Sequence, residues 1–347
     1  MREVKINNNI IDKIKLGKAT HIILDDEIDN YQELVLKSDN DMVKVLITGK
    51  SKYRSFEDCF KIIPIDLFGM SSIDEARDIY FNNDLLRVYR VKCDIDKNDK
   101  IINKNILELI DISSLKRNNI GYSSVCVYEV TLKNGLPGIL KVQYLSCRNN
   151  LNDEYNRINW LQKKFMVPKV YGYFEDENGK YLLMERLKGI PAYETDKYSF
   201  EIGKALKQFH DIKIDDCKFM QNSIDCLLEN AIKNIDIILT EINNLYPDMN
   251  REDVIDFLVN NKPNDKVLVH GDFSLPNILI DEDGSIGLID LGDVSVSSKY
   301  FDFFYLRKSL IRNNKMDNFS KILEGYGINE LDNKYLKWME IVDTVLN

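Results

Sequence analysis

The pattern of apolar and polar residues between positions 267 and 293 predicts a β-hairpin. The run VLV ends just before a His-Gly-Asp sequence, and two further apolar runs, NILI and IGLI, flank Asp283-Gly284. Asp-Gly between apolar runs is typical of a two-residue hairpin turn. Antiparallel pairing centred on that turn would set Asn277 opposite Asp290, with Cβ atoms about 5 Å apart. Asp272, in the loop after VLV, can reach the same point.

The pattern near the amino terminus predicts a small, mostly β domain over residues 1–95. Its strands are short runs rich in β-branched residues: IILDD, ELVLK, MVKVLITG and LLRVYRVK. The segment SSIDEARDIYFN has a helical pattern, with Ser72 or Ser71 at its N-cap. The segment DIDKNDKIINKN is polar, charged and poor in aromatic residues, so we place a linker over 96–111.

Beyond the linker, residues 112–187 are rich in strand patterns and residues 188–347 in helical ones. Three segments have apolar residues at three- and four-residue spacing: DKYSFEIGKALKQFHDI, IDCLLENAIKNIDIILTEINNLY and MNREDVIDFLVNN. The chain of 347 residues is long for one domain. We therefore expect an α+β protein of two or three compact units.

Charge and cysteine content narrow the classes of function. The net charge is −9 and no polybasic stripe occurs, which argues against nonspecific nucleic-acid binding and suits a cationic small-molecule substrate. The six cysteines form no CxxC pair and have no nearby histidine at zinc-ligand spacing. They are typical of reduced thiols in a cytosolic protein. The start MREVKINNN has no signal-like apolar segment, so we expect a cytoplasmic location without membrane attachment.

The polar residues of the predicted hairpin suit phosphoryl transfer. Asn277 and Asp290 offer oxygen ligands to one hard cation, and Asp272 supplies a carboxylate beside it. Such a site also needs a loop over the phosphates, a lysine and an acidic residue that holds the lysine. The sequence supplies a bend with Gly121 and two serines in NNIGYSSVCVYEV, then Lys141 in GILKV, and Glu154 in the amphipathic helix NLNDEYNRINWLQKKF. The segment YLLMERLKG would link a β lobe to a helical lobe, where backbone groups of Glu185 and Leu187 could contact adenine.

From about residue 112 onward the chain resembles the aminoglycoside 3'-phosphotransferases, which have a bilobal protein-kinase-like fold. The resemblance rests on IGYSSVCVYEV, GILKV, NDEYNRINWL, VPKVYGY, LLMERLKG, DFLVNNKPNDKVLVHGDFSLPN, GLIDLGDVSVSSKYFDFFYL and LDNKYLKWMEIVDTVLN, in the family's order. It implies that Asp272 is the catalytic carboxylate facing the substrate hydroxyl and that Asn277 and Asp290 hold Mg²⁺. It also implies that Lys141 contacts ATP phosphates, that Glu154 pairs with Lys141, and that Ser123 lies in the nucleotide loop.

Departures from the family's pattern concern the substrate and the nucleotide. The family usually has Gly-Arg where this chain has Gly292-Asp293, an Asp in place of Ser298, and often a Glu in place of Thr344. The family holds the ammonium groups of the antibiotic with acidic side chains and the terminal carboxylate. Ile139 replaces an aromatic residue that stacks on adenine in some members, so both ATP and GTP are candidate nucleotides. The candidate substrate residues are Glu241, Asp248, Glu252, Asp293 and Asn347, with Asp253 in the same region.

Residues 1–95 resemble ASCH domains, small β-barrels related to PUA RNA-binding domains. The resemblance rests on LGKAT, VLITGKSKYRSFEDCF and DLFGMSSIDEARDIYFN. It implies RNA or a nucleoside as a possible partner. In the family's Gly-x-Lys pattern Ala19 occupies the lysine position and Lys18 lies one residue early, so we assign no catalytic residue there.

Three functional hypotheses follow. The first is an ATP- and Mg²⁺-dependent kinase of a small polar molecule, an aminoglycoside at its 3' position. The second is a kinase of another antibiotic, a metabolite or a modified nucleoside. The third is an RNA-binding protein with a regulatory kinase-like half. In all three we expect His210 and His270 to be structural and Asp302 to support the Asp272 loop by hydrogen bonding. The oligomeric state is left open.

Overall fold

The computed structural model describes most of the chain, and its residues form two compact units. The described residues are 2–15, 19–24, 28, 33–39, 41–53, 55–80, 86–93, 103–118, 125–144, 150–177 and 179–346. One unit comprises Met1–Tyr155 with Val170–Arg186, and the other Asn156–Lys169 with Leu187–Asn347. Within the described residues no helix is long and apolar enough to cross a membrane.

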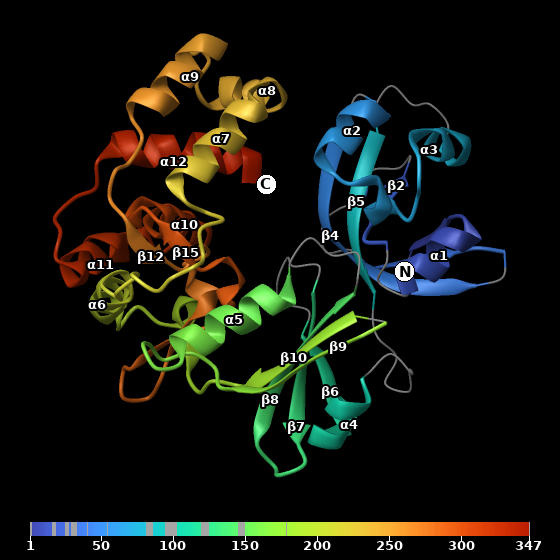
Figure 1. Cartoon of the computed structure of the whole chain (residues 1–347), viewed down its shortest axis with the longest axis horizontal. Helices are drawn as coiled ribbons and strands as arrows, with labels where there is room; N and C mark the ends of the chain where they lie inside the picture. The colour runs from blue at the N-terminus through green and yellow to red at the C-terminus, as the bar shows by residue number, and fades with distance from the viewer. Residues whose placement is uncertain are drawn as a thin grey trace. The chain divides into compact units, whose positions relative to one another are not determined.

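The first unit begins with a five-stranded sheet that has helices against it (Figure 1). In spatial order the strands are β1 (Arg2–Lys5), β3 (Glu33–Lys37), β4 (Met42–Tyr53), β5 (Leu86–Cys93) and β2 (His21–Leu24). The β1–β3 pair is parallel and the other pairs are antiparallel. The helical segments are α1 (Asn8–Lys15), α2 (Phe56–Ile62), the 3₁₀ turn η1 (Ile65–Phe68) and α3 (Ile73–Ile79). The Ser72 hydroxyl accepts a hydrogen bond from the Glu75 N–H, which confirms the predicted N-cap of α3.

The predicted small β-barrel is not found among the described residues, because their strands form an open sheet with a separate apolar core on each face. Tyr89 and Val91 of β5 pack with the core that contains α1, whereas Leu86 and Val88 pack with the core that contains α2. Successive strand residues point to opposite faces, so this alternation supplies both cores from one strand. A barrel would gather its apolar side chains on a single interior face.

A second sheet completes the first unit. It is antiparallel, with the spatial order β6 (Ile110–Asn118), β7 (Cys126–Leu132), β8 (Pro137–Tyr144), β10 (Gly179–Glu185) and β9 (Val170–Asp176). The helix α4 (Lys104–Leu109) packs on this sheet through Ile106. The range predicted as a linker, 96–111, therefore contains α4 and the buried Ile110 at the start of β6. The predicted helix after β8 is α5 (Leu151–Leu161), and its last six residues belong to the second unit.

The second unit is mainly helical, as predicted. Its remaining helices are α6 (Ser199–His210), α7 (Ile224–Lys233), α8 (Ile235–Leu245), α9 (Arg251–Asn260), α10 (Lys299–Arg312), α11 (Phe319–Tyr326) and α12 (Asn333–Leu346). Its short strands are β11 (Ile190–Pro191), β12 (Val267–Val269), β13 (Ile278–Ile280), β14 (Ile286–Leu288) and β15 (Ser295–Ser297). The 3₁₀ turns are η2 (Ala192–Glu194), η3 (Leu275–Asn277), η4 (Leu291–Asp293) and η5 (Met316–Asn318). In spatial order, β11, β13 and β14 form one small sheet, and β12 pairs with β15 in another.

Close packing of α6 against α11 fixes one wall of this unit. A Cβ atom on Gly203 would lie 1.9 Å from the Ile322 carbonyl oxygen, and one on Gly325 would lie 2.0 Å from the Phe200 carbonyl oxygen. Only residues without a Cβ atom allow the two helix backbones to approach so closely. This contact brings His210, the last residue of α6, within hydrogen-bonding distance of Tyr326 at the end of α11.

Candidate active site

In the first unit, Lys141 and Glu154 form the predicted ion pair. The Lys141 Nζ atom lies 2.6 Å from the Glu154 Oε1 atom, and the two side chains are only 11% and 7% exposed. Lys141 occupies the face of β8 opposite Leu140 and Val142, which fill the core of the sheet. At the start of α5, the Leu151 N–H donates to the Gln143 Oε1 atom of β8 at 2.6 Å. This bond anchors the helix so that Glu154, in its first turn, meets the lysine.

The four other residues predicted to contact the nucleotide do not all lie in the same part of the structure. Glu185 ends β10 opposite Gly138 of β8, in the first unit. Leu187 belongs to the second unit. Gly121 and Ser123 lie outside the described residues. Contacts of these four residues with adenine or phosphate therefore stay predictions.

In the second unit, the buried Asp302 carboxylate holds the loop that follows β12. Its Oδ2 atom accepts a hydrogen bond from the His270 N–H at 2.8 Å, and its Oδ1 atom accepts one from the Gly271 N–H at 3.0 Å. The His210 Nε2 atom donates to Oδ2 at 3.0 Å, and the Tyr326 hydroxyl lies 2.9 Å from His210 Nδ1. The predicted supporting role of Asp302 and the structural role of His210 are confirmed.

The His270 side chain also forms hydrogen bonds with backbone groups. Its Nε2 atom lies 3.0 Å from the Ile289 carbonyl oxygen, which can only accept, so Nε2 carries a proton. Its Nδ1 atom accepts a hydrogen bond from the Asp272 N–H at 3.3 Å. Both ring nitrogens are therefore used in a neutral tautomer, and the predicted structural role is confirmed.

Asp272 projects from this loop and is oriented by Asn277. The Asn277 Nδ2 atom donates to the Asp272 carbonyl oxygen at 3.0 Å and to its Oδ2 atom at 2.8 Å. Burial raises the pKa of the Asp272 carboxyl, and the nearby Asp290 carboxylate raises it further. Hydrogen bonds from Ser274 and Asn277 oppose that shift. Because the Asn277 amide nitrogen faces Asp272, its amide oxygen is the atom suited to a cation.

The hairpin exists, but its predicted register is wrong by one residue. Ile278 pairs with Leu288 and Ile280 with Ile286, so Asn277 stands opposite Ile289, whose N–H donates to the Asn277 carbonyl oxygen at 3.0 Å. The turn is longer than predicted, because the Gly284 N–H bonds to the Asp281 carbonyl oxygen and Gly284 adopts a φ of 85°. This is a three-residue loop with a left-handed glycine, one of the common hairpin connections.

Asp290 and Asp293 lie beyond the end of the hairpin. Asp290 is one of the non-glycine residues with left-handed backbone, at φ 60° and ψ 62°, and Asp293 ends the turn η4. Although the Asp293 side chain is exposed, desolvation by the surrounding protein raises its pKa; Asp290 raises it further and Arg157 lowers it. Gly271 packs directly against Asp293, since a Cβ atom there would lie 2.3 Å from the Asp293 carbonyl oxygen. Asp272, Asp290 and Asp293 are thus neighbours.

The donor atoms of this region suit Mg²⁺, which prefers oxygen ligands from carboxylates and leaves room for phosphate oxygens. Asn277 offers an amide oxygen and Asp290 a carboxylate. Within the described part of the chain, no three His, Cys, Asp or Glu side chains form a metal-binding group on their own.

The predicted substrate residues are spread more widely. Glu241 on α8, Asp248 in the following loop and Glu252 on α9 are exposed. Asp253 forms a capping box with Asn250 at the start of α9, so that carboxylate is used within the helix. Asn347 lies outside the described residues.

The sequence interpretation missed two groups of side chains in the second unit. The Tyr305 hydroxyl and the Lys308 Nζ atom both contact the Asp343 carboxylate, at 2.7 Å and 2.5 Å. Burial raises the pKa of the Tyr305 phenol, as do Asp343 and then the carboxylates of Asp272 and Asp293.

The second group is Arg157, whose Nε atom donates to the Val294 carbonyl oxygen. An arginine on the apolar side of a predicted helix was a visible signal of a buried role.

Two departures from the family pattern now have a structural role. Ser298 is the N-cap of α10, with its hydroxyl accepting from the Tyr300 N–H at 3.2 Å and donating to Asp265 at 2.6 Å. It thereby fixes the start of the helix that carries Asp302. The Thr344 hydroxyl bonds to the Ile341 carbonyl oxygen within α12.

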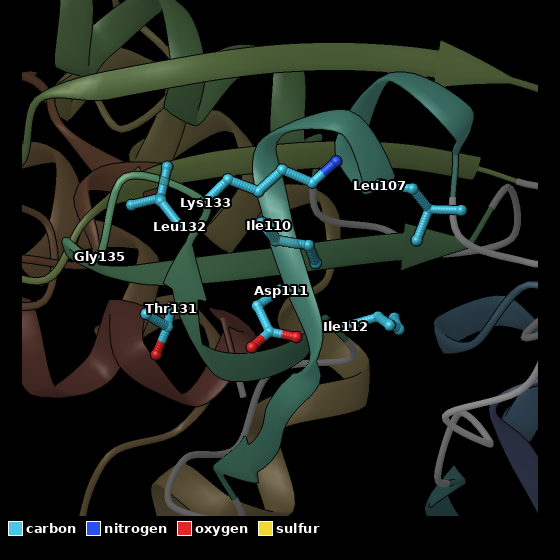
Figure 2. A pocket seen from close by; sticks show the side chains of 8 residues that line it. All are labelled: Leu107, Ile110, Asp111, Ile112, Thr131, Leu132, Lys133 and Gly135. Carbon is cyan, nitrogen blue, oxygen red and sulfur yellow. The ribbon is translucent and has the colours of Figure 1, made fainter.

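A pocket of about 690 Å³ lies elsewhere in the first unit, beside α4, β6 and the β7–β8 turn (Figure 2). Leu107, Ile110 and Leu132 contribute apolar surface, while Asp111 and Lys133 add charge. None of the predicted site residues lines this pocket. It is therefore separate from the residues predicted to bind nucleotide.

Comparisons with known proteins agree with this arrangement. A model described as the phosphotransferase enzyme family matches residues 114–334. An aminoglycoside 3'-phosphotransferase of Niallia circulans is 31% identical over 247 residues, covering 68% of this chain and 94% of the relative. Another from Escherichia coli is 26% identical over 247 residues, covering 65% and 88%.

Solved structures share the fold. A type VIII aminoglycoside-3'-phosphotransferase matches with a TM-score of 0.54 at 20% identity, covering 67% of this chain and 94% of that chain. A Streptomyces rimosus aminoglycoside phosphotransferase, solved with ADP and streptomycin, matches with a TM-score of 0.51 at 19% identity, covering 67% and 92%. At these identities the structures show the fold alone, which is the predicted kinase-like α+β fold.

Proposed function

The chain belongs to the phosphotransferase enzyme family, and from this premise we propose that it transfers the γ-phosphoryl group of ATP to the 3'-hydroxyl of an aminoglycoside. The relatives named above carry that activity in their names. It is an ATP-dependent phosphotransferase with a hydroxyl acceptor, and phosphorylation of the antibiotic would confer resistance. The observation that carries the proposal is the Asp272 carboxylate, held by Asn277 and by a loop fixed on Asp302.

Each predicted residue has a definite task in this proposal. Asp272 accepts a hydrogen bond from the acceptor hydroxyl and aligns its oxygen for in-line attack. Lys141, kept in place by Glu154, contacts the phosphates of ATP. Asn277 and Asp290 would hold Mg²⁺, which when bound neutralises charge on the phosphate oxygens. Gly121, Ser123, Glu185 and Leu187 keep their predicted contacts with the nucleotide.

The negative charge near Asp272 supports a cationic acceptor. Asp293 adds a carboxylate where the family commonly has an arginine, so this chain exchanges a positive for a negative charge beside the catalytic residue. We assign Asp293 to the acceptor, with Glu241, Asp248, Glu252 and Asn347 as outer candidates. Competition between ATP and GTP in the same assay would determine the nucleotide preference.

The first test is turnover by an Asp272→Ala variant. Because the carboxylate acts on the hydroxyl and leaves nucleotide binding to other residues, kcat should fall by about 10²-fold or more, with little change in nucleotide affinity. ADP release with a panel of aminoglycosides measures kcat, and mass spectrometry with NMR locates the new phosphate. The control is Glu282→Ala, at the exposed tip of the same hairpin, which should behave as wild type.

Two outcomes would redirect the proposal. Unchanged kcat in Asp272→Ala would show that another group aligns the acceptor. Turnover with ATP but with none of the aminoglycosides, together with unchanged aminoglycoside susceptibility of a host carrying the gene, would favour another small-molecule acceptor. The RNA-binding hypothesis requires an inactive kinase-like half, and the Lys141–Glu154 pair and the Asp272–Asn277 contact argue against it.

A further inference from the structure

The backbone that follows Asp290 is held from outside by one short segment, residues 219–222. The Phe219 carbonyl oxygen accepts hydrogen bonds from the Val296 N–H at 2.8 Å and from the Ser295 hydroxyl at 3.0 Å. The Asn222 Nδ2 atom donates to the Asp293 carbonyl oxygen at 3.0 Å. These three bonds fix Asp293, Ser295 and Val296, which follow the predicted metal ligand within six residues.

Arg157, near the middle of α5, contacts both the backbone after Asp290 and the segment 219–222 that holds it. Its Nε atom donates to the Val294 carbonyl oxygen at 2.8 Å, and its guanidinium carbon lies 5.2 Å from the centre of the Phe219 ring. The residue is only 4% exposed. Burying an arginine is costly, so a purely space-filling role would favour an apolar residue here. Gln221 donates to the same Val294 carbonyl oxygen at 3.2 Å.

Val294, the residue that Arg157 holds, is linked through the backbone to Asp290 and through packing to the Asp272 loop. Asp290 is separated from Val294 by the single turn η4, and the Val294 N–H bonds back to the Leu291 carbonyl oxygen at 3.4 Å. On the other side, Asp293 packs against Gly271, the residue before Asp272. A shift of the Val294 peptide would therefore move Asp290 and press on the Asp272 loop.

We propose that Arg157 is a positioning residue, whose hydrogen bond to Val294 and cation–π contact with Phe219 keep Asp290 placed to bind the cation. This inference rests on the proposed phosphotransferase function. The planar guanidinium suits this role, because its Nε atom donates to the Val294 carbonyl oxygen while its central carbon lies over the Phe219 ring. Lysine could supply the charge and one donor, but it lacks the planar face.

The experiment measures how Mg²⁺ supports nucleotide binding in Arg157→Met and Arg157→Lys. Calorimetry with ADP over a range of Mg²⁺ concentrations should show that Arg157→Met needs about tenfold more Mg²⁺ for half-maximal binding. Arg157→Lys should fall between this variant and wild type. In turnover assays the same order should appear in the Mg²⁺ requirement of kcat, with a smaller change in the KM of the acceptor. Gln221→Ala, which removes the second donor to Val294, should give a smaller shift in the same direction.

Trp160→Phe is the matched control for stability. Trp160 lies one turn further along α5, contacts Phe219 edge-on at 5.8 Å, and donates from Nε1 to Asp216 at 3.1 Å. This variant should lower Tm with no change in the Mg²⁺ requirement. A wild-type Mg²⁺ requirement in both Arg157 variants, accompanied by a lower Tm, would reduce Arg157 to a structural residue and overturn the inference. Failure of the proposed function is distinct, because wild-type protein itself would then turn over no acceptor.

Discussion

The two groups of charged residues differ in how their charge is balanced. In the first unit, Lys141 and Glu154 form a buried pair of opposite charges. In the second unit, the Asp290 carboxylate raises the pKa of both Asp272 and Asp293, and Asp272 is held by the neutral amide of Asn277. The first group is complete within the protein, whereas the second accumulates negative charge that a cation or an ammonium group would relieve. The contrast separates a charge pair that is balanced within the protein from a group of carboxylates that a bound cation would stabilise.

The largest predicted effect is on the buried pair. Glu154→Gln leaves the Lys141 ammonium buried without its carboxylate, so the free energy of unfolding should fall by about 3–5 kcal/mol. In Lys141→Met/Glu154→Gln most of that loss should be recovered, because neither charge remains. Urea denaturation of the two single variants and the double variant measures this coupling. If the double variant lost the sum of the single losses, the pair would not be a self-contained unit.

The second prediction tests how much the buried, ionised Asp272 carboxylate destabilises the fold. Because its folded-state pKa is raised, folding favours the protonated carboxyl. Its contribution to stability is therefore fully present below the ordinary Asp pKa of about 3.9, and it is lost as the pH rises through the higher folded value. At pH 7 in EDTA, Asp272→Asn should have a Tm higher than wild type by on the order of a few degrees, although its activity is lost.

The check on this prediction is the pH dependence of the difference in Tm. The advantage of the Asn variant should shrink as the pH approaches 4, because the wild-type carboxyl then becomes protonated as well. Glu282→Ala provides the control, since the exposed hairpin tip should show no such advantage. A variant less stable than wild type at pH 7 would mean that hydrogen bonding to the ionised carboxylate outweighs its burial.

Local sequence patterns were sufficient for much of the fold. The helical periodicity of α5, α6 and α7 followed from neighbours along the chain. The open form of the N-terminal sheet did not, because alternation in β5 supplies two cores, and only the positions of α1 and α2 on opposite faces reveal that. Pairing of strands distant in sequence is a tertiary property that a run of five residues does not encode.

The site shows the same limit at the scale of single residues. The Lys141–Glu154 pair could be predicted because a strand and the next helix have few ways to pack. The hairpin register could not, since Asp283-Gly284 is compatible with both a two-residue turn and a three-residue loop. Arg157 was missed because its partner, the Val294 carbonyl oxygen, is 137 positions away and is a backbone atom. The arginine on the apolar side of the helix indicated a buried role, but no side-chain motif identifies a backbone partner.

The smallest predicted effect concerns an exposed ion pair, and it tests whether short separation or burial makes an ion pair important for stability. Lys262 and Asp225 lie 2.7 Å apart, almost the separation of Lys141 and Glu154, but their side chains are 40% and 68% exposed. Lys262 lowers the pKa of the Asp225 carboxyl, so the pair stabilises the fold only above the ordinary Asp pKa, and solvent weakens the attraction. Lys262→Met should therefore change Tm by about 1 °C or less at pH 7, and 1 M NaCl should remove even that difference. If Lys262→Met lost as much stability as Glu154→Gln, a separation below 3 Å would itself be sufficient for a strong ion pair. A negligible loss would instead show that Glu154→Gln is costly because it leaves the Lys141 charge buried without its partner.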